Sequence, residues 1–379
     1  GAIDGGERPA VPAAILKYHI TEMGRAVAND AMDVHGGKGV MLGPRNYIAR
    51  GYQAAPIGIT VEGANILTRN LIIFGQGAIR CHPFVLKEMQ AARNPEGERS
   101  AVDFDRALFG HIGFAVSNAV RSLVMALTLA RFESAPGKGP IRRYYQHIER
   151  FSASFAFATD VAMLSLGGYL KKKENLSARL GDVLSNLYLA SMVLKHHHDG
   201  GSQKADQPVV EWACRHLLYR AQEQLHDFLR NFPNRWLASL MRAMIFPRGR
   251  TYSAPADRLT AQLAELAMTP GEVRERLCRH AYLGGADNPL RELGEALRLA
   301  PTVEPIDRRL RVEGVKTGRV TALDVPGQVA QGLELGILSA AEADLLRDYD
   351  RRIMHIINVD DFAPEDLPAG RAAPPTRSP

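Results

Sequence analysis

One glutamate and a group of glycines are the residues whose types and spacing best suit chemistry. The chain runs Asp33-Val-His-Gly-Gly-Lys-Gly39, and after a stretch rich in glycine and proline it reaches Glu62-Gly63-Ala64-Asn65. Glycine lets a backbone approach a ligand and present its N–H groups to an anion. Glu62 precedes a predicted helix, where its carboxylate either caps the helix or acts as a base in an apolar cleft.

Taken separately, these features have ordinary structural explanations. A glycine pair after a helix usually only ends that helix. A glutamate at a helix start is usually only a favourable partner of the helix dipole. The glycines follow no predicted strand, which excludes a Rossmann dinucleotide-binding fold. The chemistry therefore depends on the elements that position these residues.

Two amphipathic helices are predicted around this segment. Apolar residues recur every three or four positions along 16–34 and again along 67–78, which is the period of one helix face. Gly36 and Gly37 are expected to end the first helix. The intervening stretch 38–60 contains several glycines and prolines, so it is predicted to be irregular.

The rest of the chain is predicted to be helical, beyond a polar boundary at residues 90–105. Apolar stripes within 112–127, 176–194 and 210–228, separated by short connectors, favour an antiparallel bundle. Shorter helices are expected further on, and the proline-rich tail 363–379 is predicted to be disordered. No long alternating pattern indicates strands, so the predicted fold class is all-α.

Composition is that of a soluble globular protein with two or three domains. The 379 residues are 46% hydrophobic and 23% charged, and no uninterrupted apolar run of membrane-spanning length occurs. A net charge of +6 permits attraction to anions, but acidic residues are interspersed among the basic ones. We therefore do not expect a dedicated nucleic-acid binder. Three widely spaced cysteines indicate a reducing cytoplasm.

A histidine run is the most conspicuous metal-ligand pattern. His196-His197-His198 precedes Asp199. Neighbouring side chains on a helix point in different directions, and no second group of ligands is evident. No metal site is expected here.

The order and spacing of the first two motifs resemble the end of the catalytic domain of flavin-dependent acyl-coenzyme A dehydrogenases. That family closes its catalytic domain with a helix, a Gln-x-x-Gly-Gly-x-Gly turn, a loop, a Glu-Gly-Thr-Ser or Glu-Gly-Thr-Asn step and a last helix. Here Asp33 stands in place of the glutamine and Ala64 in place of the threonine, and Arg69 lies in the last helix.

The later part of the chain resembles the helical extension of large bacterial long-chain enzymes of the FadE type. The likeness covers residues 101–362. Four stretches carry it: Phe109-Gly-His-Ile-Gly-Phe-Ala-Val-Ser-Asn118, Arg179-Leu-Gly-Asp-Val-Leu-Ser185, Phe228-Leu-Arg-Asn-Phe-Pro-Asn-Arg235 and Ile357-Asn-Val-Asp-Asp-Phe362.

The resemblance implies a catalytic and substrate-binding role for Glu62. Its carboxylate would remove the α-proton of an acyl thioester while the β-hydrogen leaves as hydride to FAD. The backbone at Glu62 and Gly63 would hold the thioester carbonyl and stabilise the developing enolate, as an oxyanion hole does.

The resemblance also implies a set of FAD-binding residues. Gly36 and Gly37 would lie against the diphosphate or adenosine part of the cofactor, usually that of a neighbouring subunit, with Asp33 beside them. Ala64 and Asn65 would approach the flavin from the start of the last helix.

These implications define a domain organisation. Residues 1–90 would be the end of the catalytic domain, residues 101–362 the helical extension and residues 363–379 the tail. The family's N-terminal helical domain and middle β-domain are expected to precede Gly1, so the chain alone is expected to be inactive.

The complete protein would oxidise medium- or long-chain acyl-CoA to trans-2-enoyl-CoA in fatty acid β-oxidation. It would pass electrons to an electron-transfer flavoprotein, as a homo-oligomer in the cytoplasm or peripheral to the inner membrane. The main alternative is a non-catalytic all-helical interaction module in which Glu62 is only a helix cap. A third is a basic nucleic-acid or lipid-surface binder.

Overall fold

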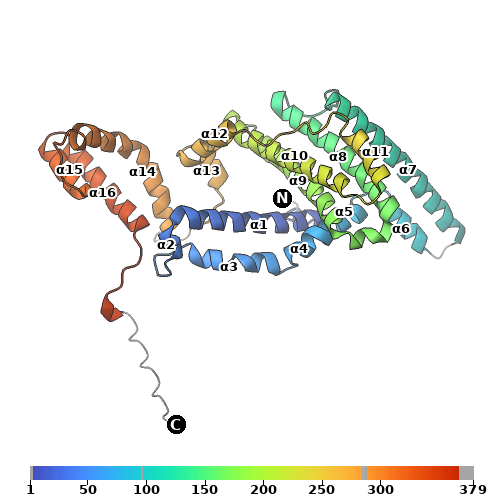
Figure 1. The fold of residues 1–379 in the computed structure, drawn as a ribbon, viewed down its shortest axis with the longest axis horizontal. Coiled ribbons are helices and arrows are strands. Elements are labelled where there is room, and N and C mark those ends of the chain that lie inside the picture. Colours follow the sequence, from blue (N-terminus) through green and yellow to red (C-terminus); the bar gives the residue numbers. More distant parts are fainter. Residues whose placement is uncertain (1–2, 95–96, 284, 286–287, 367–379) are drawn as a thin grey trace, which may run out of the picture. The chain divides into compact units, whose positions relative to one another are not determined.

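The computed structural model is built from helices that belong to two compact units (Figure 1). It describes residues 3–94, 97–283, 285 and 288–366. The first unit comprises residues up to Met23 together with Ile57–Ala267, and the second comprises Gly24–Pro56 and the residues from Met268 onward. The structure is 76% helical, and the described residues contain no strand. The predicted all-α fold class is confirmed.

Long helices joined by short connectors form the first unit. Helix α9 contacts both α8 and α10, while α7 packs on α8 and α11 on α7. Because these connectors are short, consecutive helices reverse direction and pack as a bundle. The bounds are α7 (Gly97–Thr128), α8 (Gly139–Leu166), η2 (Gly167–Lys172), α9 (Glu174–Asp199), η3 (Lys204–Asp206), α10 (Gln207–Arg230), α11 (Arg235–Ile245) and α12 (Asp257–Met268).

The segment that carries Glu62 lies beside this bundle. Three short pieces run on from one another as a single helical stretch, interrupted only by a π-helical turn. This stretch packs on α9. The pieces and their neighbours are α1 (Ala10–His35), α3 (Ala49–Thr60), α4 (Asn65–Leu67), the π-helical turn η1 (Thr68–Ile73), α5 (Phe74–Arg80) and α6 (Val85–Arg93).

The core of the first unit is formed by the apolar faces of α8, α9 and α10. The stripes predicted within 176–194 and 210–228 are buried there. Their most deeply buried members have exposed fractions of 0–1%: Leu180, Val183, Leu194, Cys214, Ala221, Leu225 and Phe228. Leu217, also predicted to be in the stripe, is only half-buried, and Leu218 is buried next to it. Periodicity identified the buried face of these two helices correctly because they have neighbours along most of their length.

Helix α7 departs from that rule. Its strongest apolar stripe, including Ile112, Val116 and Val120, is more than half exposed. The face that packs on α8 instead carries the buried Met125, which clusters with Ala153, and a buried hydrogen bond of 2.8 Å between the hydroxyls of Ser122 and Ser154. The prediction that the apolar stripe marks the packed face is wrong here.

Two helical stretches are long and apolar enough to cross a membrane by length and composition, namely Arg99–Thr128 and Gly139–Lys172. A third qualifies if the bent pair Ala49–Thr60 and Asn65–Arg80 counts as one span. The sequence criterion of an uninterrupted apolar run missed them because glycine, serine and histidine punctuate these stretches.

The second unit has its own smaller core. Its helices are α2 (Gly37–Val40), α13 (Glu272–Cys278), α14 (Pro289–Leu310), the π-helical turn η4 (Arg311–Val315), α15 (Val325–Glu334) and α16 (Ala340–Ile357), with a 3-10 turn η5 (Pro364–Asp366). Helix α16 begins with a capping box in which Ser339 and Glu342 satisfy each other's backbone N–H groups. Arg309 on α14 forms an ion pair of 2.6 Å with Glu342. The cap and the ion pair thus fasten α16 to α14.

Two expectations about irregular segments are wrong. The stretch 38–60 contains α3, which includes Pro56, and its last turn packs on α1 through Gly58 and Thr21. The polar stretch 90–105 is also largely helical, because α7 already begins at Gly97. Of the predicted disordered tail, residues 367–379 lie outside the described residues. The division into 1–90 and 101–362 stays a prediction.

Replacing the buried Leu225 by alanine should lower the free energy of unfolding by about 2–5 kcal/mol, because a cavity remains where the side chain was fully enclosed. Leu164→Ala is the matched control, since that side chain is 91% exposed and its loss should change stability by less than about 0.5 kcal/mol. Chemical denaturation measures both. Equal effects would mean that α10 is not the centre of this core.

Candidate active site

Glu62 lies in a tight bend between α3 and α4 and has a left-handed backbone, with φ of 56°. Gly63 follows with φ of 87°. The first value is unusual, because a residue with a Cβ pays about 1–3 kcal/mol for such a conformation and keeps it only where its surroundings enforce it. The side chain of Glu62 is exposed. The bend therefore presents a carboxylate outward from a strained position.

The carbonyl of Gly63 is held from two sides. The Lys17 ammonium on α1 donates to it over 2.7 Å, and the Thr68 hydroxyl donates to it over 3.2 Å. Lys17 also donates to the Asn65 side-chain oxygen over 2.6 Å. These contacts tie the bend to α1 and to the following helix, and they explain how the strained backbone at Glu62 is maintained.

Asn65 is buried and its amide is held by α1. Its nitrogen donates to the Thr21 hydroxyl over 2.9 Å and to a Glu22 carboxylate oxygen over 2.8 Å. Its oxygen accepts from Lys17 over 2.6 Å, while the single hydrogen of the Thr21 hydroxyl goes to the Lys17 carbonyl oxygen over 2.7 Å. Both amide hydrogens of Asn65 are therefore used within the fold.

The start of this helix is open to a polar ligand. Ala64 occupies the N-cap position, is half-buried, and caps the helix with no side-chain hydrogen bond. The first N–H groups of a helix have no partner within the helix, and they favour an electron-rich group. Among the predicted site residues, Glu62, Gly63, Ala64 and Asn65 thus share one bend and one helix start.

A bidentate ion pair fixes the other face of this helix. Arg69 donates from Nε to Asp182 Oδ1 over 3.0 Å and from Nη2 to Asp182 Oδ2 over 2.6 Å. Asp182 lies on α9, with only 11% of its side chain exposed. The hydrogen bond to Asp182 is the main reason that the pKa of Arg69 lies above its usual value. The resemblance named Arg69 but gave no partner for it.

Two glycines permit this close packing. A Cβ at Gly181 of α9 would lie 3.2 Å from the backbone oxygen of Arg69, and one at Gly77 of α5 would lie 2.8 Å from the Leu184 side chain. Gly181 and Asp182 are adjacent in the stretch 179–185. The helix that follows Glu62 therefore packs against residues 179–185 of α9.

The predicted glycine turn lies in the second unit. Helix α1 ends at His35, and Gly36 follows with φ of 53°, so the expected helix end is confirmed. The His35 ring fixes the turn by contacting the Ala31 carbonyl oxygen at 2.8 Å and the Tyr47 hydroxyl at 2.7 Å. Asp33, Gly36 and Gly37 are all exposed.

The backbone of this turn is accessible. A Cβ added at Gly36 or Gly37 would meet no atom within 4 Å. The Gly36 N–H already donates to the Met32 carbonyl oxygen over 3.0 Å, so the open space leaves the Gly37 side of the turn for a ligand. A Cβ at the buried Gly39 would lie 3.3 Å from Met32 atoms, so that position is closed.

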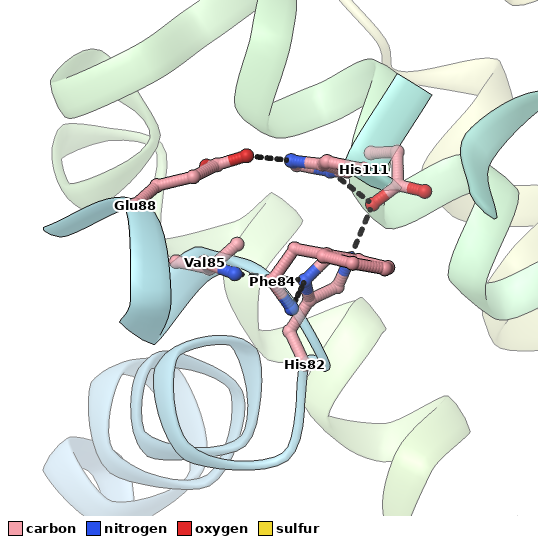
Figure 2. A network of polar contacts seen from close by, with 6 residues as sticks. His82, Phe84, Val85, Glu88 and His111 are labelled. Carbon is pink, nitrogen blue, oxygen red and sulfur yellow. Dashed lines mark hydrogen bonds and ion pairs between the residues drawn. The ribbon is translucent and has the colours of Figure 1, made fainter. Parts of the chain in front are cut away.

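A polar cluster that the sequence did not reveal lies between α6, α7 and α8. Figure 2 shows the His82 ring beside Phe84 and Val85 at the start of α6. Its Nδ1 accepts from the backbone N–H groups of Phe84 and Val85, both over 3.2 Å. Its Nε2 therefore carries the hydrogen and donates to Asp160 Oδ1 over 3.1 Å. That nitrogen has no lone pair for a metal ion.

His111 completes the cluster by bridging two carboxylates. Its Nδ1 lies 2.8 Å from Glu88 Oε1 and its Nε2 lies 3.4 Å from Asp160 Oδ1. His82, His111 and Asp160 offer ligand-type atoms within 4.8 Å of one another. The hydrogen bonds nevertheless account for this geometry as a link between α6, α7 and α8.

Two protein-family models match the chain. A family model described as acyl-CoA dehydrogenase, C-terminal, bacterial type, matches residues 79–362, and one described as acyl-CoA dehydrogenase, C-terminal domain, matches residues 1–75. The chain belongs to the acyl-CoA dehydrogenase family.

The chain is also similar in structure to an acyl-CoA dehydrogenase from Bacillus anthracis complexed with FAD. It is 15% identical, with a TM-score of 0.49 over 68% of this chain. The match spans 39% of that enzyme's length. FAD, the cofactor expected for the family, is present in that enzyme.

Asp182→Asn should lower the free energy of unfolding by about 1.5–3 kcal/mol, because it weakens two charge-assisted hydrogen bonds to Arg69 in a mostly buried place. Asp103→Asn is the control, since Asp103 has 61% of its side chain exposed. A double-mutant cycle with Arg69→Gln measures the coupling. Purely additive effects of the two substitutions would show that the pair does not hold the helix.

Proposed function

We propose that this chain is the C-terminal part of an FAD-dependent acyl-CoA dehydrogenase with Glu62 as the catalytic base. One observation carries the proposal: an exposed carboxylate in an enforced left-handed bend, within the segment matched by the family's C-terminal domain. Backbone strain of this kind concentrates at functional sites. A carboxylate that served only as a helix cap would not need a strained backbone.

The bend supplies both groups that proton abstraction requires. The Glu62 carboxylate points outward and is free to take the α-proton of an acyl thioester. The backbone N–H groups of Glu62 and Gly63 are positioned at the same bend to hold the thioester carbonyl, where negative charge develops. FAD, when bound, accepts the β-hydrogen as hydride. The product is a trans-2-enoyl-CoA.

The residues proposed for FAD fit that cofactor unequally. Gly36 and Gly37 offer an accessible backbone to the diphosphate or adenosine part. Ala64 and the backbone of Asn65 offer an uncapped helix start to the flavin. Asp33 is exposed beside the glycines and carries the same charge sign as a diphosphate, so its contact would be with a polar, uncharged part of the cofactor.

The proposed substrate, pathway and electron acceptor are those expected for the acyl-CoA dehydrogenase family. We propose medium- or long-chain acyl-CoA as the substrate, fatty acid β-oxidation as the pathway and an electron-transfer flavoprotein as the acceptor. FadE-type enzymes with a helical extension are the proposed subgroup. Activity is proposed to require further segments of the complete enzyme, so that this chain alone would be inactive.

Exposed apolar surface supports the proposed assembly and location. Ile20, Met23 and Val27 on α1 and Ile112 and Val116 on α7 are each more than half exposed. Contiguous apolar surface of this kind marks interaction sites. We propose a homo-oligomer in the cytoplasm or peripheral to the inner membrane, with the apolar face of α7 as a surface available to a membrane.

In the flavin-loaded complete enzyme, Glu62→Gln should lower the rate of acyl-CoA oxidation by about 10²–10⁴-fold, because the amide cannot take a proton. Flavin absorbance should be retained, and exchange of the substrate α-proton with deuterated water should stop. Glu304→Gln, an exposed substitution of the same type with 66% of the side chain accessible, is the control. Undiminished turnover by Glu62→Gln would exclude Glu62 as the base and would favour the alternative function, a non-catalytic interaction module.

A further inference from the structure

The stretch 357–362, which follows α16, lies against the glycine turn that follows α1. The Lys38 ammonium donates to the Asn358 carbonyl oxygen over 2.7 Å. The Arg45 backbone N–H donates to both oxygens of Asp360, over 3.1 Å to Oδ1 and 3.0 Å to Oδ2. These contacts span 320 and 315 residues of sequence, yet both lie within the second unit. Residues 358–360 therefore hold the loop from Lys38 to Arg45 at both of its ends.

Gly43 leaves the space that the Asp360 carboxylate occupies. A Cβ added at Gly43 would lie 2.1 Å from Asp360 Oδ2 and 2.4 Å from its carboxyl carbon, closer than non-bonded atoms approach. Gly43 does not have a positive φ, so its backbone conformation alone does not require glycine. The small residue at this position is therefore explained by the close approach of Asp360.

Asn46, the neighbour of Arg45, connects this contact to the glycine turn. Its side chain is buried, and its Nδ2 shares two hydrogens among the carbonyl oxygens of Lys38, Gly39 and Met41, at 2.9, 3.0 and 2.9 Å. Its oxygen accepts from two backbone N–H groups at the start of α3. One side chain thus fixes α2 and the start of α3 together, beside the backbone that Asp360 holds.

The two glycines proposed to meet FAD belong to the same hydrogen-bond network. The Gly36 carbonyl oxygen accepts from the Gly39 N–H over 3.0 Å, and the Gly37 carbonyl oxygen accepts from the Met41 N–H over 3.1 Å. The Asn46 side chain bonds the carbonyl oxygens of Gly39 and Met41. A movement of the Arg45–Asn46 backbone would therefore reach Gly36 and Gly37 through consecutive hydrogen bonds.

Helix α16 gives residues 358–360 a fixed support. Ala343 and Leu346, in its first half, share a buried cluster with Leu310 of α14. In its last turn, His355 Nδ1 lies 2.5 Å from Glu292 Oε2 of α14. The segment that carries Asp360 therefore follows a helix that is held on α14 near both of its ends.

We propose that Asp360 is a positioning residue for the glycine turn and keeps the backbone at Gly36 and Gly37 in the conformation that meets FAD. The inference rests on the proposed contact between these glycines and the cofactor. A carboxylate that touched FAD there would repel its diphosphate. Asp360 acts instead through the Arg45 N–H, where its charge strengthens the hydrogen bond.

The first test uses the 379-residue chain without flavin. Asp360→Ala should speed the exchange of the hydrogen-bonded amides of residues 36–46 with deuterated water about tenfold, because a charge-assisted hydrogen bond that restrains the turn is lost. Mass spectrometry of peptides from this segment measures the exchange. Asp361→Ala is the matched control, since this neighbouring carboxylate is exposed and should leave the exchange unchanged. Unchanged exchange in Asp360→Ala would overturn the inference.

Two further variants separate the hydrogen bond from other effects. Gly43→Ala should speed exchange as much as Asp360→Ala does, because the added Cβ would displace the carboxylate. The double variant should exchange no faster than either single one, since both remove the same contact. Asp360→Asn should stay close to the native rate, because its amide oxygen can still accept from Arg45. Additive effects of Gly43→Ala and Asp360→Ala would contradict a shared contact and overturn the inference.

The second test titrates FAD into the flavin-free complete enzyme and follows flavin fluorescence. Asp360→Ala should weaken FAD binding about tenfold, with kcat per bound flavin unchanged, whereas Asp361→Ala and Asp360→Asn should not weaken it. Tighter binding in both Asp360 variants would show a purely electrostatic role and overturn the inference. Faster exchange with unchanged FAD affinity would instead overturn the proposed FAD role of the glycine turn. Neither result depends on Glu62, whose role is tested by turnover.

Discussion

The bidentate ion pair between Arg69 and Asp182 is the interaction on which the Glu62 bend depends. It joins the helical stretch that starts at Asn65 to α9, the helix at the centre of the largest core. At the start of the same stretch, α1 fixes two further residues. The Asn65 amide donates to Thr21, and the Gly63 carbonyl accepts from Lys17. A strained residue keeps its conformation only if its neighbours are fixed. The ion pair provides that fixed point for Glu62.

The two arginines of this unit show how burial changes what a cation needs. Arg69 is partly exposed and meets a carboxylate in bidentate geometry, so its charge is compensated within the fold. Arg150 is deeper, and its guanidinium donates to the Thr251 hydroxyl and lies over the Phe151 ring. Desolvation without a counter-ion costs more than one hydrogen bond returns.

Sequence patterns were informative where local chemistry decides the structure. Gly36 ends α1 because glycine tolerates a positive φ, and this is a property of one residue. The stripes of α9 and α10 are buried because both helices are enclosed by neighbours. The residue pattern also predicted a helix start after Glu62, and the structure shows Glu62 in the bend directly before α4. Its catalytic role, like the roles of the proposed FAD residues, stays a prediction.

The patterns failed where the outcome depends on a distant partner. Helix α3 forms despite Pro56, since its end packs on α1, and sequence distance hides that contact. Neither the His82–Asp160 link nor the burial of Arg150 has a local signal, because each requires knowing which groups from other helices come within reach. An isolated arginine in a helix looks like a solvated charge. Only the packing of α8 shows that it is not.

The apolar face of α7 and the packing site on α9 show what the residues after the Glu62 segment contribute to the structure. The segment matched by the C-terminal domain model ends at residue 75. Its last helical stretch packs on Gly181 and Asp182, which lie in the segment matched by the bacterial-type model. The two matched segments therefore share one packed interface in the first unit. The contact surface on α9 is polar and closely packed, so it serves to position the Glu62 bend. The apolar face of α7 is exposed, so it remains available for a partner surface.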